Sequence, residues 1–389
     1  MHMKIGVIGA GRLGICFALL LDKAGYSIVA SDVREDYVKS LCEKRIDTAE
    51  PYVQELLSSS NNITFRTGNY DVINECDVLY TLVATPSCSD GSYDVSAIWR
   101  VIADIQNATT LGINVKGKAF IVGCTTNPGD CELFRKQLEP YGVEVFYNPE
   151  FIAQGSIIKD LENADMVLVG GPEGKYRSFI EEIYNKIQVK KPKICFMSTT
   201  AAELVKLAVN CFLTTKISYA NMVGEVMTLA GLENEIEQVL GAIGSDTRVG
   251  NKYLKYGYGF GGPCLPRDNR SFAAYAKKLG LEYNLGKTTD DFNNEHAKFL
   301  KNYFIGKNKE KLPFYFDYIS YKKGTDIFTE SQQYRLCLDL LDEGYEVYIG
   351  ENKSVTGQIK DYLHSKYKNS VHFITKDNEI KIDMFSVFV

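Results

Sequence analysis

The sequence predicts an α/β protein with a doubly wound parallel sheet, a long helical region and a second, smaller α/β domain. Three observations lead to this prediction. Short apolar runs alternate with helical patterns over residues 4–170. A helical pattern with few breakers extends from 200 to about 230. Strand and helix patterns then alternate again from 314 to 349.

The N-terminal elements begin with a βαβ unit, which consists of a buried strand at 4–9, a helix at 14–23 and a second strand at 27–31. Strands that alternate with helices pair in parallel and carry helices on both faces of the sheet. Helical stretches separate most of the strand-like runs that follow, which lie at 78–84, 119–123, 143–147 and 166–170.

The elements beyond 199 begin with the helical pattern at 200–230, whose length and apolar character favour packing between domains or against a second subunit. More helix is expected up to 242 and from about 270 to 302. A charged connector at 307–311 leads to the last predicted elements, which are a strand at 314–320, a helix at 331–343, a strand at 346–349 and a final strand at 388–389.

The composition is that of a soluble globular protein, with 389 residues that are 45% hydrophobic and 24% charged. A net charge of −5 argues against general binding of nucleic acids or anionic membranes. No apolar run approaches the roughly 18 residues that span a bilayer, and the first residues lead straight into a strand without a signal peptide. We therefore expect a cytoplasmic protein.

The cysteines and histidines indicate neither a disulfide framework nor a metal site. Ten cysteines are scattered along the chain without a CxxC pair, so most are expected to be buried thiols in a reducing compartment. The four histidines, at positions 2, 296, 364 and 372, lack the spacing of metal ligands.

A glycine-rich turn, GAGRLG at 9–14, directly follows the first strand and opens a helix. Its glycines allow a pyrophosphate to approach the backbone, and the helix N-terminus supplies N–H donors. Asp32 ends the second strand 18 residues after Gly14, where a carboxylate accepts hydrogen bonds from a ribose and repels a 2′-phosphate. This pattern predicts NAD rather than NADP as the cofactor; the alternative is an ordinary βαβ turn with an incidental aspartate.

A second glycine-rich segment, GYGFGGPCLPRD at 257–268, carries Cys264. A thiol on such a loop, with an arginine nearby, is a candidate nucleophile because positive charge favours the thiolate. The alternative is a connector whose cysteine only packs.

Four further residues carry groups suited to catalysis. Lys206 and Asn210 share one face of the long helix, a turn after Glu203, and together can stabilise an oxyanion, although the same spacing suits an ordinary amphipathic face. Glu150 and Thr125 follow predicted strands, where ligands of open α/β sheets bind. Glu150 is a candidate base or water-positioning group, and equally a turn acid.

Taken together, these segments resemble the UDP-glucose/GDP-mannose dehydrogenase family, and most closely its short bacterial-type UDP-glucose 6-dehydrogenases. The resemblance implies two Rossmann-like domains joined by a long central helix that forms a homodimer interface. It assigns 1–196 to an NAD-binding domain, 197–305 to a helical dimerisation region with the cysteine loop, and 306–389 to a nucleotide-sugar-binding domain. The matching segments keep the family's order: GAGRLG, ATP at 84–86, Thr125, NPEF at 148–151, the Lys206/Asn210 helix, DTRVG at 246–250, the cysteine loop and YKK at 321–323.

The resemblance implies a four-electron oxidation of UDP-glucose to UDP-glucuronate, with water and two NAD⁺ as co-substrates. Cys264 would capture the C6 aldehyde as a thiohemiacetal, which a second oxidation turns into a thioester. Lys206 and Asn210 would stabilise the oxyanion, and Asp268 would orient Lys206 or water. Glu150 would be the base for thioester hydrolysis, with Thr125 holding the water.

The resemblance also implies the binding residues. For the cofactor they are Gly9, Gly11, Arg12, Leu13, Gly14, Asp32, Thr85, Pro86, Thr125 and Gln154. For the nucleotide sugar they are Glu150, Phe151, Lys206, Asn210, Tyr253, Leu254, Lys255, Tyr256, Gly257, Gly261 and Lys322, with Arg248 reaching the sugar of the neighbouring subunit.

The sequence departs from the family pattern at several positions. Gln154 stands where the family has glutamate, Thr329 where it has arginine, and Cys124 where it has serine; TNPG at 126–129 also differs. These changes bear on cofactor affinity and sugar identity more than on reaction type. UDP-N-acetylglucosamine or GDP-mannose as substrate, or a catalytically impaired binding protein, are the alternatives. A protease-like thiol enzyme lacks a histidine partner, since His296 is the only histidine between residues 3 and 363.

Overall fold

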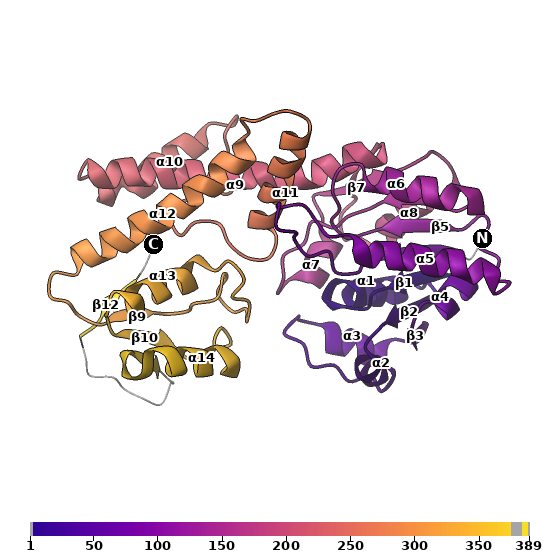
Figure 1. The fold of residues 1–389 in the computed structure, drawn as a ribbon, viewed down its shortest axis with the longest axis horizontal. Helices are drawn as coiled ribbons and strands as arrows, with labels where there is room; N and C mark the ends of the chain where they lie inside the picture. The colour runs from indigo at the N-terminus through magenta and orange to yellow at the C-terminus, as the bar shows by residue number, and fades with distance from the viewer. Residues whose placement is uncertain (1–2, 375–382, 388–389) are drawn as a thin grey trace. The chain divides into compact units, whose positions relative to one another are not determined.

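The computed structural model describes residues 3–374 and 383–387, and the chain divides into two compact units, Met1–Lys206 and Leu207–Val389. One mostly parallel sheet, one parallel sheet and a long central helix confirm the predicted fold class (Figure 1). The predicted strand at 388–389 lies outside the described residues.

The first unit contains an eight-stranded sheet with the order β3-β2-β1-β4-β5-β6-β7-β8. Neighbouring strands are parallel except β6 and β7, which meet in an antiparallel pair at Tyr147 and Gly170. In the parallel register, Ile5 lies opposite both Ile28 and Val78. The strands are β1 (Ile5–Ile8), β2 (Ile28–Asp32), β3 (Ile63–Thr67), β4 (Val78–Thr81), β5 (Ala119–Val122), β6 (Glu144–Tyr147), β7 (Met166–Gly170) and β8 (Lys193–Met197).

Two apolar cores cover the two faces of this sheet. One includes Phe17 and Tyr184 from α1 and α8, and the other includes Ile102 and Phe134 from α5 and α6. These side chains are at most 1% exposed, so each contributes a large apolar burial that fixes its helix on the sheet. The helices are α1 (Arg12–Lys23), α2 (Glu35–Cys42), α3 (Val53–Ser59), α4 (Tyr70–Glu75), α5 (Ser96–Thr110), α6 (Asp130–Leu138), α7 (Ile157–Glu162) and α8 (Lys175–Ile187).

The long helix α9 (Thr199–Leu229) begins in the first unit and continues into the second. The second unit also holds a four-stranded parallel sheet of order β11-β10-β9-β12, whose core includes Phe314, Leu336 and Phe304. Its elements are α10 (Ile236–Ser245), α11 (Leu265–Lys278), α12 (Leu285–Lys307), β9 (Phe314–Phe316), α13 (Gln332–Asp342), β10 (Val347–Gly350), α14 (Gly357–Tyr367), β11 (Val371–Ile374) and β12 (Phe385–Ser386). Short 3₁₀ turns lie at Glu139–Tyr141, Glu233–Glu235 and Lys368–Ser370.

Some boundaries differ from the predictions. The helices expected from about 270 to 302 are α11 and α12, and the first of them begins five residues earlier than predicted, at Leu265. The strand expected at 314–320 ends at Phe316. In the described part of the chain, no helix is long and apolar enough to cross a membrane.

Candidate active site

The turn after β1 has the geometry of a pyrophosphate cradle. Gly9 has φ +95°, and a Cβ there would lie 2.8 Å from the Leu82 carbonyl oxygen. A Cβ on Gly14 would lie 1.9 Å from the Gly9 carbonyl oxygen, so only glycine fits both positions. Gly11, which precedes α1, has no atom within 4 Å of its Cβ position, so a ligand can approach it. The N-terminal N–H groups of α1 suit the negative charge of a pyrophosphate.

Asp32, the last residue of β2, is held by Arg34. The arginine Nε and Nη2 donate to the two carboxylate oxygens at 2.8 and 3.0 Å, and its backbone N–H donates to Oδ1 at 3.1 Å. Burial raises the pKa of the Asp32 carboxyl, but the hydrogen bonds and charge of Arg34 outweigh this and hold the pKa below its usual value. Asp32 is therefore ionised, and both of its oxygens already accept hydrogen bonds.

The structure brings two other predicted cofactor residues together. Arg12, the first residue of α1, donates from Nη1 to Oε1 of Gln154 at 3.1 Å. The glutamine that departs from the family pattern thus contacts the glycine-rich turn by accepting a hydrogen bond from the charged Arg12, where a glutamate would form an ion pair. Thr85 is buried and Pro86 exposed in the segment after β4.

Glu150, in the turn after β6, lies in a network of buried polar groups. The Tyr184 hydroxyl is hydrogen-bonded to the Glu150 carboxyl group and, at 2.9 Å, to Oδ1 of Asn148. Asn148 Nδ2 donates to the Leu168 carbonyl oxygen at 3.0 Å, which fixes the orientation of its amide. A protonated Glu150 can donate to Tyr184 while Tyr184 donates to Asn148. An ionised Glu150 instead accepts a hydrogen bond from the Tyr184 hydroxyl.

The pKa of Glu150 suits a general base. Although part of its side chain is accessible, surrounding protein atoms desolvate the carboxyl group and raise its pKa to about 7. The hydrogen bond from Tyr184 and the charge of Lys206 only partly offset this effect. A carboxyl that titrates near neutral pH can accept a proton from water at physiological pH.

Lys206, from the first part of α9, lies beside Glu150. Its Nζ donates to the Glu150 backbone carbonyl at 2.7 Å and lies 4.6 Å from the centre of the Phe151 ring. The side chain is 8% exposed. A buried ammonium with donors beyond this one bond can bind a developing oxyanion.

Glu203 has a structural role that the sequence did not reveal. It is fully buried and accepts hydrogen bonds from Thr126 Oγ1 at 2.8 Å, Cys131 N at 2.8 Å and Gly129 N at 2.7 Å. These contacts satisfy N–H groups at the start of α6 and tie the turn that carries Thr125 to the first part of α9. Glu203 therefore positions the residues around it.

In the second unit, Cys264 is an exposed thiol that directly precedes α11. Pro266 lies in the first turn of this helix, where its missing N–H costs nothing, which explains why the helix begins earlier than predicted. The positive end of the helix dipole then favours the anionic thiolate at Cys264. All ten cysteines lie in the described part of the chain, and each is a thiol.

Asp268, four residues after Cys264, is hydrogen-bonded to Asn210. Asp268, in the first turn of α11, is 1% exposed, and its carboxylate accepts a hydrogen bond from Nδ2 of Asn210 on α9. The next residue, Asn269, is hydrogen-bonded to Thr214 and Thr289 at 2.8 Å each. The start of α11 is thus fixed to α9, with Lys206 one turn before Asn210 on the same helix.

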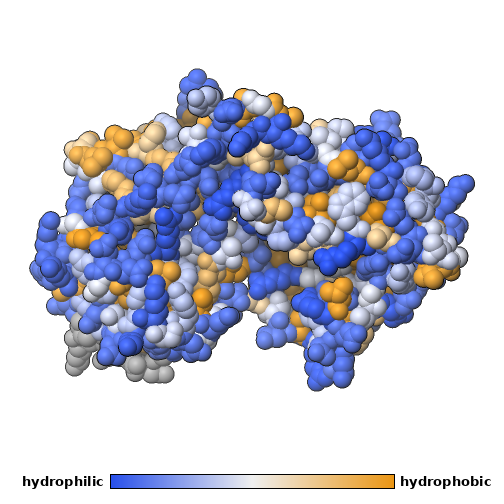
Figure 2. Space-filling view, in the orientation of Figure 1, coloured by the Kyte–Doolittle hydropathy of each residue, from blue (hydrophilic) through white to orange (hydrophobic). Residues whose placement is uncertain are grey.

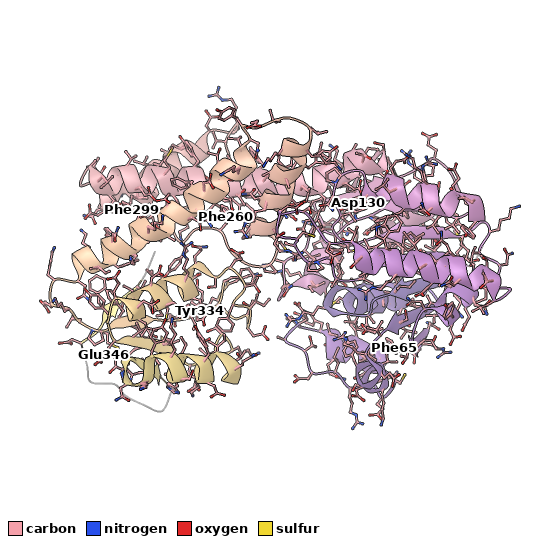
Figure 3. All side chains as sticks on the ribbon, in the orientation of Figure 1. Phe65, Asp130, Phe260, Phe299, Tyr334 and Glu346 are labelled. Atoms are coloured by element: carbon pink, nitrogen blue, oxygen red, sulfur yellow. The ribbon has the colours of Figure 1, made fainter. Side chains whose placement is uncertain are left out.

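The cysteine loop is held by close backbone contacts. A Cβ on Gly261 would lie 2.3 Å from the Glu330 carbonyl oxygen, and Gly262, with φ +81°, donates from its N–H to the Thr329 carbonyl at 3.1 Å. Phe260, labelled in Figure 3, is hydrogen-bonded through both its N–H and its carbonyl to the Asn293 side chain of α12 at 2.9 Å. The loop is therefore preorganised, and Thr329 takes part through its backbone.

His296 anchors the start of the same loop. It is fully buried on α12 beside Phe299, which is labelled in Figure 3. Its Nε2 lies 2.8 Å from the Gly257 carbonyl oxygen and its Nδ1 lies 2.6 Å from Oε1 of Glu225. A carbonyl only accepts, so Nε2 carries a proton. The histidine is part of the loop's support.

The predicted sugar-binding segment is partly core and partly surface. Leu254 is buried in a cluster with residues of α9 and α10, and the ring of Tyr256 packs against Gly224. Tyr253 and Lys255 are exposed. The remaining predicted cations lie elsewhere in the second unit: Arg248 is exposed and pairs with Asp246 at 2.6 Å, and Lys322 is exposed between β9 and α13.

Among the residues that the structure describes, no group of three or more His, Cys, Asp or Glu could hold a metal ion.

Two segments of the chain match one known protein family. Residues 3–188 match the NAD binding domain of the UDP-glucose/GDP-mannose dehydrogenase family, and residues 200–295 match its central domain. The UDP-glucose 6-dehydrogenase AglM of Haloferax volcanii is 29% identical over 381 residues, which cover 92% of this chain and 85% of AglM.

Two solved structures share the fold. A UDP-glucose dehydrogenase from Pyrobaculum islandicum is 25% identical, with a TM-score of 0.83 over 97% of this chain and 87% of that one. A UDP-D-ManNAc dehydrogenase from Pyrococcus horikoshii is 20% identical, with a TM-score of 0.77 over 99% of both chains.

Proposed function

Because the chain belongs to the UDP-glucose/GDP-mannose dehydrogenase family, we propose that it oxidises the C6 alcohol of UDP-glucose to a carboxylate. The overall reaction consumes one UDP-glucose, two NAD⁺ and one water, and yields UDP-glucuronate, two NADH and three protons. The observation that carries this proposal is the exposed Cys264 thiol at the N-terminus of α11, on a loop fixed by its glycine contacts, in a chain that also has an NAD cradle.

The cofactor is NAD, which accepts a hydride in each of the two oxidations. Gly9, Gly11 and Gly14 would hold its pyrophosphate at the N-terminus of α1, and Asp32 would face the adenosine ribose.

Cys264 acts on the aldehyde that the first oxidation produces. Its Sγ bonds to C6 as the C=O π bond opens, and the aldehyde oxygen takes up a proton to become the hydroxyl of a thiohemiacetal. Loss of a hydride from C6 and a proton from this hydroxyl gives the thioester. Lys206 and Asn210 stabilise the negative oxygen that develops at C6, and Asp268 positions the Asn210 amide through their hydrogen bond.

Glu150 acts in the last step. It removes a proton from water, whose oxygen attacks the thioester carbon, and Thr125 holds that water. The C–S bond breaks, the thiolate of Cys264 is restored, and the sugar acid is released. The raised pKa of Glu150 supports this role.

The proposal is tested by counting NADH. With NAD⁺ and a panel of UDP-glucose, UDP-N-acetylglucosamine, UDP-N-acetylmannosamine and GDP-mannose, we expect two NADH per sugar consumed, with the highest kcat/KM for UDP-glucose. One NADH per sugar would overturn the thioester route. A higher kcat/KM for another sugar would reassign the substrate, and no turnover across the panel would favour a binding protein.

We also propose that the protein is a cytoplasmic homodimer. Its thiol cysteines suit a reducing compartment. Apolar residues gather on the surface over α9 and α10, at the upper left of Figure 2. On α9 the exposed apolar residues follow helical spacing and form a stripe suited to a second copy; they are Phe212, Tyr219, Met222, Val226 and Leu229.

A charge in this stripe is expected to separate the subunits. The Val226→Glu variant should be a monomer by analytical ultracentrifugation under conditions where the wild type is a dimer, because a buried, unpaired carboxylate opposes association. Val189→Glu, at a valine outside the stripe that is even more exposed than Val226, should remain a dimer. A dimeric Val226→Glu variant would contradict this assignment of the interface.

A further inference from the structure

Arg34 changes the chemistry at the cofactor's adenosine end. Its guanidinium pairs with both carboxylate oxygens of Asp32 and lies 4.1 Å from the centre of the Tyr37 ring. The Tyr37 hydroxyl in turn donates to the Ala10 carbonyl at 2.9 Å, within the glycine-rich turn. Asp32, Arg34 and Tyr37 therefore form one connected cluster beside the pyrophosphate cradle.

This cluster removes the basis on which an acid at this position excludes NADP. An aspartate at the end of β2 favours NAD because its charge repels a 2′-phosphate. Here the guanidinium neutralises that charge at a bidentate pair. Arg34 also competes with the ribose hydroxyls for the two oxygens of Asp32. The preference for NAD over NADP is therefore reduced for two reasons: repulsion of the 2′-phosphate is weaker, and so is binding of the ribose.

Arg34 also offers a phosphate ligand of its own. The pair with Asp32 uses Nε and Nη2, whereas a guanidinium carries five N–H donors in a planar fork that matches phosphate geometry. The Arg34 side chain is 56% exposed, while the Asp32 side chain is only 8% exposed. The solvent-facing groups at this edge therefore include the arginine's remaining donors rather than the carboxylate. Glu35 and Asp36 follow in the first turn of α2. Their negative charge weakens the attraction between Arg34 and a phosphate, but they do not take up the N–H donors of the guanidinium.

We propose that Arg34 is a cofactor-specificity residue through which this protein binds NADP⁺ and NADPH as well as NAD⁺ and NADH. Arg34 neutralises Asp32 and pairs with the 2′-phosphate of the larger cofactor. The inference concerns the nucleotide site and does not rest on the proposed sugar oxidation.

The test is a titration of the intact protein with NADH and NADPH, without sugar, followed by cofactor fluorescence. Wild-type dissociation constants for the two cofactors should lie within about tenfold of each other. In Arg34→Ala, NADPH binding should weaken at least about tenfold, the loss expected for a charge-assisted bidentate contact. NADH binding should stay within about threefold of wild type or tighten, because Asp32 is released for the ribose.

Matched variants separate specificity from folding. Arg34→Lys keeps the charge but not the fork and should give an intermediate NADPH affinity. Lys39→Ala removes another exposed cation from α2 and should leave the ratio of the two dissociation constants unchanged. The inference is overturned if wild-type protein binds NADH but not NADPH, or if Arg34→Ala leaves that ratio unchanged. Because the titration contains no sugar, either result leaves the proposed oxidation standing.

Discussion

Replacement of Cys264 by serine is expected to lower steady-state formation of the sugar acid by at least about a thousandfold, the scale of losing a covalent nucleophile. The first oxidation needs no thiol, so one equivalent of NADH per active site should still form. The aldehyde then has no thiolate to capture it. Serine at the N-terminus of α11 stays protonated at neutral pH, because the helix dipole is far too weak to ionise a hydroxyl.

Rapid mixing of Cys264→Ser with NAD⁺ and UDP-glucose measures this directly. We expect a burst of at most one NADH per site, followed by little further turnover, and mass spectrometry should detect no covalent sugar adduct on the protein. Cys42→Ser, at another exposed cysteine, should retain wild-type turnover and stoichiometry. Two NADH per sugar from Cys264→Ser at a wild-type rate would refute the role of the thiol.

The parts of the molecule that were predictable from sequence depend on short-range pattern. The βαβ unit with its glycine turn and Asp32 lies within 30 residues, so its spacing is visible in the sequence, although the backbone that crowds Gly9 comes from Leu82 on a distant segment. The long helix α9 was equally visible, because 31 residues without a strong breaker leave few alternatives. Buried central strands were found from their continuous apolar runs.

The strands of the eight-stranded sheet that escaped prediction are at its edges, and the unpredicted β11 is likewise an edge strand of the second sheet. β3 and β8 are the outermost strands, and each pairs with one neighbour only. Their burial is incomplete, so they carry residues such as Arg66 and Lys193 that break the apolar run. The start of α11 was missed for a different reason: Pro266 looks like a breaker in the sequence but is compatible with a first helical turn.

The electrostatics of the site depend on contacts that the sequence does not display. Tyr184 reaches Glu150 across 34 residues, from α8 to the turn after β6. Glu203 lies one turn before Lys206 in the sequence pattern, yet its carboxylate accepts hydrogen bonds from backbone N–H groups at the start of α6. Arg34 is only two residues from Asp32, but its side chain could equally have pointed to solvent. Pairing of this kind is decided by the packed side chains around it.

Replacement of Glu150 by glutamine is expected to slow hydrolysis of the thioester by about a hundredfold or more, within the range for loss of a general base. The substitution keeps the shape of the side chain but removes the site that accepts water's proton. Both oxidations should proceed, so a burst approaching two NADH per site should precede slow turnover, with the sugar trapped on Cys264. Wild-type kcat should rise with pH through about 7, the pKa of Glu150, and this rise should be absent in the variant.

The same variant makes an independent prediction for stability. The pKa of Glu150 is raised in the folded state from 4.5 to about 7, so the protonated carboxyl is favoured by folding. Its contribution is present in full below pH 4.5 and is lost as the pH rises through 7, a loss on the order of 3 kcal/mol of unfolding free energy. Urea unfolding at pH 5 and pH 8 should therefore show a larger decline for wild type than for Glu150→Gln. The exposed control Glu173→Gln should decline as the wild type does. Equal declines in wild type and Glu150→Gln would mean that Glu150 has an ordinary pKa, and its assignment as the base would lose its physical support.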